Sequence, residues 1–483
     1  MVWTKEEFSA KVRDGQQIKH PWKNAFHLEM PFGLINDPNG LSFYQGKYQI
    51  FYQWNPYGCE HKQKHWGHVA TSDFIHYTEP VLAMKPDCWF DKDGCYTGCA
   101  FTENEELHVV YTGNVRTETM ERQSYQCLAK AEADGTLSKE KILIEQQPAG
   151  YTAHFRDPYV FFRGNKKYLL AGIQTENLAG RLVLYRETAG KWELVGEIAT
   201  DFNAMGYMWE CPNILRFGDE DVIVFSPQGL KAERYQYQNL YQTGYAIGTL
   251  DTEKAVFSHG KFTELDHGFD FYAPQVMEHE GRKLLLGWMG MPERDAEYPT
   301  RENGGWMFSL TIPRELVLKN DKIYQYPAVE LEKLRQKEQS SVAKGAHSWE
   351  QVLPRQAEIE LRICLGKAKK IAYAFYFGAE RLVFIYDDTE KSMVINRTGM
   401  KLGGRGIRRF KLGCKGELHV RIFMDRTAME CFFQQGEEAA AILYFPEKEC
   451  VPEFSVQADE DWNQLTCKCW ELGRIVYEES GSV

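Results

Sequence analysis

Three acidic residues stand next to strand-like segments, each beside a proline or one residue from it. They are Asp37 in "NDPNG", Asp157 in "FRDPYV" and Glu210 in "WECPNI". Two carboxyl groups that face each other across a sugar can cleave a glycosidic bond, one as the nucleophile and the other as the proton donor to the leaving oxygen. Like charges held close together raise the pKa of one group, so one can stay protonated while another is ionised. That chemistry requires the fold to bring the three residues together.

The same residue types also have simpler explanations. Asn, Asp, Pro and Gly favour tight turns, so "GLINDPNG" around Asp37 could be only a turn. Clustered carboxylates could bind Ca²⁺, but the chain has no dense D-x-D-x-[DN]-G loop. The segment "HKQKHWGH", with His61, His65 and His68, is a poor metal site, because Trp and Gly interrupt the helix that its spacing would need. We expect no metal ion and no cofactor.

The elements that must position the carboxylates repeat along the chain. Each repeat has an apolar strand, a turn with Gly or acidic residues and a second apolar strand, and the repeats start near residues 37, 97, 157, 210 and 273. A unit of roughly 60 residues has room for four strands, and radial repetition of four-stranded sheets is the β-propeller architecture. A β-sandwich does not predict so regular a unit. We therefore expect an all-β fold with a five-bladed β-propeller, in which equivalent points of the blades converge.

Aromatic residues occur in the same repeats. Aromatic faces stack on the C–H surfaces of sugars, while their N–H and O–H groups remain available for hydrogen bonds. Each of these side chains alone is more often a core residue, so the case depends on the set. The set that could line a sugar site consists of Trp54, Trp66, Tyr96, Trp209, Tyr272 and Trp288.

Composition and charge restrict the possible functions. The 483 residues are 43% hydrophobic, and their net charge of −11 argues against a nucleic-acid partner, because phosphates bind clustered basic surfaces. The N-terminus has no apolar signal-peptide segment, and no run of about 18 apolar residues could cross a membrane. The twelve cysteines lack the dense spacing of a secreted disulfide framework. We expect a cytoplasmic protein that binds neither nucleic acid nor membranes, and the oligomeric state stays open.

The sequence pattern changes after the propeller repeats, which indicates a second domain. We assign residues 1–330 to the propeller domain, residues 331–346 to a linker helix and residues 347–483 to a second domain. Alternating apolar segments in the second domain, such as "EIELRICL" and "LHVRIFMD", predict half-buried strands and hence a C-terminal β-sandwich. Asp425, Arg426 and Glu430 are expected to satisfy strand ends and a cross-strand ion pair, and not to form a second active site.

The order of the motifs resembles that of glycoside hydrolase family 32, the invertases and fructanases. The motifs are "INDPNG", "FYQWNP", "HWGHVATSDFIHY", "YTGCA", "FRDP", "WECP" and "FYAPQ…GWMG". They occur in the family's order over residues 27–335, and "HVRIFMDRTAMECFF" is similar to the family's sandwich domain. Within the family, "GYTAHFRDP" and "GYMWECPN" most resemble the enzymes that act on sucrose 6-phosphate.

The resemblance implies a retaining β-fructofuranosidase whose substrate is sucrose, sucrose 6-phosphate or a short fructan. It implies that Asp37 is the nucleophile, that Glu210 is the acid and base, and that Asp157 holds hydroxyl groups of the fructosyl unit. The further sugar-binding or supporting positions that it implies are Asn36, Gln53, Tyr96, Thr97, Arg156, Cys211, Tyr272 and Trp288, to which the aromatic set adds Trp66.

Narrower questions stay open at this point. The second-blade motif usually reads Phe-Ser-Gly-Ser, whereas here it is "YTGC", and His61 replaces a common Trp. The same architecture could serve a fructo-oligosaccharide hydrolase, a fructosyltransferase or a non-catalytic carbohydrate-binding protein. If the substrate carries a phosphate, a local cation must overcome the net negative charge. The loops that adjoin the catalytic strands offer Lys62, Lys64, Lys231 and Arg234.

Overall fold

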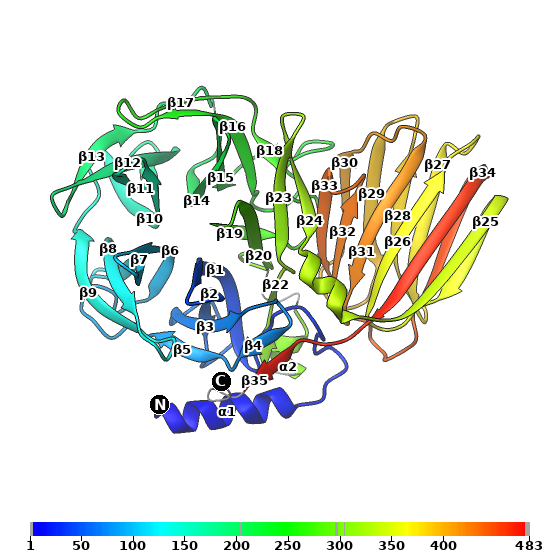
Figure 1. Cartoon of the computed structure of the whole chain (residues 1–483), viewed down its shortest axis with the longest axis horizontal. Helices are drawn as coiled ribbons and strands as arrows, with labels where there is room; N and C mark the ends of the chain where they lie inside the picture. The colour runs from blue at the N-terminus through cyan, green and yellow to red at the C-terminus, as the bar shows by residue number, and fades with distance from the viewer. Residues whose placement is uncertain (1–2, 203, 295–297, 304, 479–483) are drawn as a thin grey trace.

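The computed structural model describes residues 3–202, 204–294, 298–303 and 305–478 as an all-β fold, with a propeller-like arrangement of sheets and a C-terminal sheet domain (Figure 1). Helix α1 (Lys5–Gln17) precedes the strands and begins with a capping box, in which Thr4 and Glu7 each bind the other's backbone N–H. Its buried residues Phe8 and Val12 belong to the propeller core. Among the described residues, no helix is long and apolar enough to cross a membrane.

The first sheet combines consecutive strands with segments from distant parts of the chain. β21 follows the short helix α2 (Thr300–Asn303) and pairs in parallel with β1, while β35 near the C-terminus pairs in parallel with β4. The sheet therefore has seven strands, and β35 ties the C-terminal segment of the chain to the propeller. Its strands are β1 (Gly33–Tyr44), β2 (Lys47–Asn55), β3 (His65–Thr71), β4 (His76–Thr78), β5 (Val81–Met84), β21 (Trp306–Met307) and β35 (Val476–Glu478).

Four further sheets follow, and each is built on a path of four neighbouring strands. These paths are β6 to β9, β10 to β13, β14 to β17, and β19-β20-β23-β24, with β18 beside β16 and β22 beside β20. The strands are β6 (Cys95–Glu103), β7 (Glu106–Arg116), β8 (Arg122–Ala131), β9 (Leu137–Ile144), β10 (Tyr151–Arg163), β11 (Lys166–Thr175), β12 (Gly180–Thr188), β13 (Lys191–Glu197), β14 (Met208–Phe217), β15 (Glu220–Gln228), β16 (Gly244–Asp251), β17 (Val256–His259), β18 (Thr263–Glu264), β19 (Tyr272–His279), β20 (Arg282–Met289), β22 (Ser309–Leu310), β23 (Arg314–Lys319) and β24 (Lys322–Pro327).

The innermost strands of these sheets form a closed ring. β1 contacts β6, β6 contacts β10, β10 contacts β14, β14 contacts β19, and β19 contacts β1. Figure 1 shows this ring at the centre of the propeller. Four sheets match the expected four-stranded blade, whereas the sheet with β1 does not, because strands from outside the repeats extend it. The prediction of a five-bladed propeller is therefore confirmed only in part, because the arrangement is propeller-like but four sheets have the form of a blade.

The C-terminal domain is a ten-stranded sheet around a hydrophobic core of its own. The long strand β34 (Glu453–Leu472) pairs with β27 through its first part, with β26 through its second part, and with β25 along its other edge. The other strands are β25 (Arg335–Val352), β26 (Ala357–Cys364), β27 (Lys370–Phe377), β28 (Glu380–Asp387), β29 (Ser392–Gly399), β30 (Ile407–Lys411), β31 (Glu417–Met424), β32 (Ala428–Phe433) and β33 (Glu438–Leu443).

The linker helix expected over residues 331–346 is wrong for most of its length. A 3₁₀ helix, η2 (Val329–Leu334), buries Leu331 and Leu334, as the apolar spacing requires. From Arg335 onward the chain is strand β25, which pairs antiparallel with β34. The local pattern could not reveal this strand, because its hydrogen-bond partner lies far along the chain and tertiary pairing overrides local preference.

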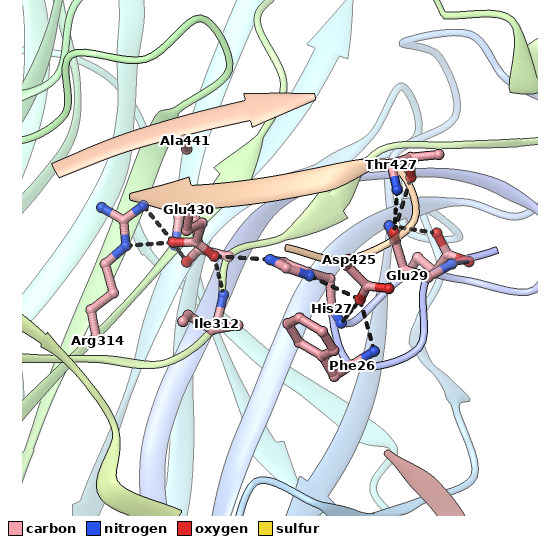
Figure 2. A network of polar contacts seen from close by, with 12 residues as sticks. Phe26, His27, Glu29, Ile312, Arg314, Asp425, Thr427, Glu430 and Ala441 are labelled. Atoms are coloured by element: carbon pink, nitrogen blue, oxygen red, sulfur yellow. Dashed lines mark hydrogen bonds and ion pairs between the residues drawn. The ribbon is translucent and has the colours of Figure 1, made fainter. Parts of the chain in front are cut away.

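Buried charged residues join the two domains (Figure 2). Asp425 accepts the backbone N–H groups of residues 25–27 at 2.8 to 3.1 Å. The ring of His27 lies between Asp425 and Glu430, with each ring nitrogen 3.1 Å from a carboxylate oxygen. Glu430 in β32 also accepts a hydrogen bond of 2.8 Å from Nε of Arg314 in β23. The ion pair of Glu430 therefore crosses the domain boundary, which corrects the expected cross-strand pair.

Candidate active site

The innermost strand of each propeller sheet has a register irregularity at a corresponding place. In each strand the pairing with the next strand shifts, so that residues bulge out of the ladder. Bulges bend a strand and re-aim its side chains, and they are common next to active sites. The adjacent residues at these five places are Asn36–Asp37, Tyr96–Thr97, Arg156–Asp157, Glu210–Cys211 and Tyr272–Ala273.

Proline explains four of the five irregularities. It follows Asp37, Asp157, Cys211 and Ala273, and it has no N–H to donate to the ladder. Three of these four residues have positive φ angles, 61° at Asp157, 48° at Cys211 and 45° at Ala273. Such strain costs on the order of 1–3 kcal/mol per residue and is typical of functional sites. The Asp-Pro and Cys-Pro motifs are therefore bulges inside strands, and not turns ahead of them.

Buried side chains satisfy the backbone groups that the bulges leave without ladder partners. Oγ1 of Thr112 accepts the N–H of Asp157 at 3.0 Å. Gln275 accepts the N–H of Leu41 and donates to the carbonyl of Gly98, both at 2.7 Å, so it links β19 to β1 and β6. Because buried polar backbone groups need partners, these contacts fix the bulged conformation.

Asp37 is half-buried and is held by two donors. Nδ2 of Asn36 donates to one carboxylate oxygen at 3.0 Å, and Oγ1 of Thr97 donates to the other at 2.7 Å. These two hydrogen bonds hold the carboxylate in one orientation. The structure therefore presents an oriented and partly accessible carboxylate, as a nucleophile requires.

A buried thiol connects Asp37 to the second carboxylate. Sγ of Cys211 lies 4.0 Å from Oδ2 of Asp37 and 3.8 Å from Oδ2 of Asp157. The backbone N–H of Cys211 also donates to Asp157 at 2.9 Å. Burial raises the pKa of Asp157 to about 7, an increase that the charges of Glu210 and Asp37 support and Arg156 opposes. Residues from β1, β10 and β14 thus meet in one small volume.

Glu210 precedes Cys211 in the same bulge and completes the group. One of its oxygens lies 2.8 Å from Nη2 of Arg156. The other accepts hydrogen bonds of 2.7 Å from Oη of Tyr272 and 2.7 Å from Nε2 of Gln228. Its side chain remains 16% exposed, so a ligand at this end of the strands can reach it.

A chain of polar side chains supports the first two bulges. Nζ of Lys64 donates to Oδ1 of Asn36 at 2.5 Å, and Nδ2 of Asn36 donates to Gln53 at 2.9 Å. Gln53 in turn donates to Oγ1 of Thr97 at 3.0 Å. Every step is buried, so the positions of Asn36 and Thr97, the two donors to Asp37, depend on one another.

The aromatic residues divide into two groups. Trp66 is fully buried in a blade core, and its indole N–H donates to the carbonyl of Tyr96 at 3.1 Å, so a direct sugar contact for Trp66 does not fit. Trp54 and Trp209 are likewise buried, and each donates to a backbone carbonyl. Trp288 is equally buried, but its indole N–H has no hydrogen-bond partner among the described residues; it lies opposite Tyr272 across β19 and β20 and packs against His61, with ring centroids 5.4 Å apart.

Several supporting residues had no clear sequence signal. Gln228 and Gln275 stand in ordinary strand patterns, and only tertiary structure shows their hydrogen bonds to Glu210 and to the ring. Lys64, a candidate cation for a substrate phosphate, is instead buried against Asn36. The sequence could have indicated the bulge at Ala273, because Ala273 precedes a proline as Asp157 and Cys211 do.

One group of possible metal ligands occurs within the described part of the chain. It consists of Asp87, Cys88 and Asp91, in the loop before β6. Nζ of Lys139 lies 2.6 Å from both aspartates, so an ammonium group already balances their charge. The three catalytic candidates are not part of this group.

Known families match the chain in two successive parts. The description "Glycosyl hydrolases family 32 N-terminal domain" matches residues 27–327, and "Glycosyl hydrolases family 32 C terminal" matches residues 330–471. The chain belongs to glycoside hydrolase family 32. As a family 32 glycosidase, it places three carboxylates on different sheets around one thiol, an arrangement suited to cleavage of a glycosidic bond.

Individual members of the family are similar along nearly their whole length. The sucrose-6-phosphate hydrolase of Bacillus subtilis (strain 168) is 38% identical over 435 residues, which are 88% of this chain and 89% of that protein. The structure of sucrose-6-phosphate hydrolase from Lactobacillus gasseri has a TM-score of 0.87 at 28% identity, covering 98% of this chain and 100% of that one. A mutant of a Bombyx mori family 32 β-fructofuranosidase in complex with sucrose has a TM-score of 0.85 at 30% identity, covering 98% and 99%.

Proposed function

We propose that the protein is a retaining β-fructofuranosidase that hydrolyses sucrose 6-phosphate, sucrose or both. The observation that carries this proposal is the meeting of Asp37, Asp157 and Glu210 around Cys211. The names of the similar proteins support the substrate, and family membership supports the type of reaction.

In the first step, a carboxylate oxygen of Asp37 attacks the anomeric carbon of the fructosyl unit. The bond from that carbon to the glycosidic oxygen breaks, and the proton carried by Glu210 passes to the departing oxygen. The donors Asn36 and Thr97 hold the attacking carboxylate in one orientation. The product of this step is a covalent ester between Asp37 and the fructosyl unit.

In the second step, water attacks the same carbon from the side that the leaving group vacated. Glu210, now ionised, takes a proton from this water, and the ester bond to Asp37 breaks. Two inversions at one carbon give net retention of configuration. Tyr272 and Gln228 hold Glu210 in place for both proton transfers.

In this proposal, Asp157 and Arg156 bind hydroxyl groups of the fructosyl unit. A carboxylate and a guanidinium side by side can accept from and donate to neighbouring hydroxyl groups. Positive charge develops on the sugar ring in the transition state, so an ionised Asp157 stabilises it. Because burial raises the pKa of Asp157 to about 7, this contribution grows as the pH rises through neutrality.

A hydrolysis comparison tests the proposal. Purified protein is incubated with sucrose, sucrose 6-phosphate and a short fructan, and released fructose is measured together with the anomer that forms first. We expect β-fructose as the first product and a clear preference among the three substrates. Absence of cleavage would reject the hydrolase proposal, and fructosyl oligomers in place of free fructose would indicate a transferase.

The domain organisation is part of the same proposal. We infer a catalytic propeller domain over residues 1–330 in which the seven-stranded sheet takes one of five blade positions, and a β-sandwich over residues 347–483 whose two layers join through β34. The boundary between the matched family segments, at residues 327 and 330, supports the division. Cysteines such as Cys95, Cys99, Cys127 and Cys211 are free thiols, which supports the cytoplasm as the location.

A further inference from the structure

The cations considered from the sequence do not gather into one site. Lys64 is buried and donates to Asn36, and Arg234 pairs with Glu390 of the C-terminal domain at 3.4 Å. Lys62 and Lys231 are exposed. A phosphate-selective group must therefore be sought among other residues near Glu210, because Glu210 faces the leaving group in the proposed reaction.

Two arginines lie directly opposite each other on neighbouring strands beside the catalytic group. Arg116 at the end of β7 pairs in register with Arg122 at the start of β8. Like charges directly opposite in a sheet destabilise it, so this pair has a local cost. Side-chain hydrogen bonds of Arg116 and Arg122 go to the carbonyl of Met120 at 3.1 Å and to Oδ1 of Asn114 at 2.9 Å. Among the described residues, neither guanidinium has a carboxylate within 4.0 Å.

The arginine pair adjoins the proposed active site. The guanidinium of Arg122 lies over the ring of Tyr96, 5.6 Å from its centroid. Tyr96 directly precedes Thr97, whose hydroxyl donates to Asp37 at 2.7 Å. Arg122 thus contacts Tyr96, the residue directly before Thr97, and Thr97 is the donor that orients Asp37.

A neutral histidine completes the cluster. Burial, followed by the charges of Arg156, Arg122 and Arg116, lowers the pKa of His154 to about 3. These charges act together on His154 because all four side chains lie in one region. Nε of Arg122, Nε of Arg156 and Nδ1 of His154 are buried and have no hydrogen-bond partner among the described residues. The region therefore has excess positive charge and unused hydrogen-bonding groups beside Glu210.

We propose that Arg116, Arg122 and His154 bind the phosphate group of a phosphorylated sugar substrate. A phosphate monoester carries close to two negative charges at neutral pH and offers three acceptor oxygens. Arginine forks bind such oxygens in a bidentate way, and neutral His154 can donate one further hydrogen bond. The phosphate also relieves the repulsion between the two arginines. This inference rests on the proposed function, and it names the side chains that distinguish sucrose 6-phosphate from sucrose.

The test compares kcat/KM for sucrose 6-phosphate with kcat/KM for sucrose in Arg122→Met and Arg116→Met. We expect the ratio to fall roughly 10- to 100-fold in Arg122→Met, as loss of a charge-assisted hydrogen bond predicts. Arg122→Lys retains the charge but not the fork, so its ratio should lie between those of the wild type and Arg122→Met. Arg186→Met is the matched control, because Arg186 in β12 pairs with Glu253 in the turn between β16 and β17 and should not change the ratio.

A ratio that stays unchanged in both Met variants would overturn the proposal, as would a change in Lys231→Ala with none in Arg122→Met. If Arg122→Met does not fold, inhibition experiments with the wild type and Arg116→Met test the phosphate site instead. Glucose 6-phosphate should inhibit sucrose hydrolysis by the wild type much more strongly than glucose does, and Arg116→Met should reduce this difference. Equal inhibition by the two sugars would overturn the phosphate site. Failure of the wild type to cleave either substrate would instead reject the proposed function.

Discussion

The protein contains two clusters of buried charged residues that differ in how well their charges are compensated. At the domain junction, Asp425 and Glu430 are fully buried, and each faces His27 together with backbone N–H groups (Figure 2). At the ring of inner strands, Asp157 is buried beside two other carboxylates, and one backbone N–H donates to it. The first cluster is balanced, and the second holds an excess of like charge.

The pKa values express this difference. At the junction, burial alone would raise the pKa of Asp425, but the hydrogen bond and charge of His27 together with backbone N–H groups outweigh it and lower that pKa. Contacts with Asp425 and Glu430 likewise outweigh burial and raise the pKa of His27 to about 9. At the ring, burial dominates and raises the pKa of Asp157 to about 7. Removal of one partner from a fully paired buried charge destabilises the fold, whereas buried charges in conflict have a cost of their own and indicate function.

The largest expected effect comes from the nucleophile. Asp37→Asn keeps the shape of the side chain but removes the covalent route, so kcat on sucrose or its phosphate should fall by several orders of magnitude. The thermal unfolding temperature should remain close to that of the wild type, because Asn can still accept from Thr97. Steady-state kinetics and calorimetry check this prediction. Near wild-type turnover would leave Asp37 with only a structural role in its bulge.

Glu210→Ala should produce a large effect that depends on the leaving group. Sucrose needs a proton on its departing oxygen, so its fructosyl transfer to Asp37 should slow greatly. An activated aryl β-fructofuranoside has a leaving group that needs no proton, so its first step should be nearly preserved. The burst of aryl alcohol measures that step. Equal losses for both substrates would contradict the role of Glu210.

His27→Ala tests the balanced cluster. Removal of His27 leaves Asp425 and Glu430 buried without that shared cation, and loss of one partner of a buried charged group costs roughly 3–5 kcal/mol of unfolding free energy. Activity per folded molecule should change little, because the junction is separate from the carboxylates of the ring. Chemical denaturation combined with kinetics provides both readouts. A stable variant with low activity would contradict the assignment of stability to the junction cluster and of activity to the carboxylates of the ring.

The junction should also respond to pH in a defined window. His27 has a folded-state pKa of about 9 against an ordinary value of 6.5, so its contribution to stability is complete below pH 6.5. It should be lost as the pH rises toward 9. Thermal unfolding of the wild type over this range, compared with His27→Gln, isolates the effect. The same slope in both proteins would assign the pH dependence to other groups.

The smallest expected effect concerns Asp157. Its pKa is raised from 3.8 to about 7, so the folded state is disfavoured as the pH rises through that range, and it remains disfavoured above it. Asp157→Asn should therefore unfold a few degrees higher than the wild type at pH 8, although its activity should be low. The two proteins should become similar near pH 4. Lower stability of the variant at pH 8 would mean that Arg156 and Cys211 outweigh the cost of burial.

The sequence predicted those parts of the fold that depend on repeated local patterns. Alternating apolar residues and recurring proline motifs identified the propeller-like repeats and the three carboxylates, because all of them occupy corresponding positions of inner strands. The sequence shows that Glu210 lies one residue further from its proline than Asp37 and Asp157 do, but it does not show why. In the structure both residues of this bulge contact the catalytic group, since Glu210 accepts from Gln228 and Tyr272 and Cys211 donates to Asp157.

Features that depend on distant partners could not be predicted in the same way. Strand β25 exists because β34 pairs with it, and strand β35 joins the first sheet from the opposite end of the chain. The burial of Trp66 and of Lys64 follows from packing between blades, which residue type does not reveal. The pairing of Arg116 with Arg122 likewise appears only when the register of β7 and β8 is known.

Intact-protein mass spectrometry of Glu210→Ala, mixed with an activated aryl β-fructofuranoside, tests the central claim most directly. Without Glu210 the ester should form quickly and be hydrolysed slowly, so the account predicts an added mass of one fructosyl unit, carried on Asp37 after proteolysis. The adduct should be absent from the double variant that also contains Asp37→Asn. No adduct despite a burst of aryl alcohol, or an adduct on another residue, would contradict the proposed nucleophile.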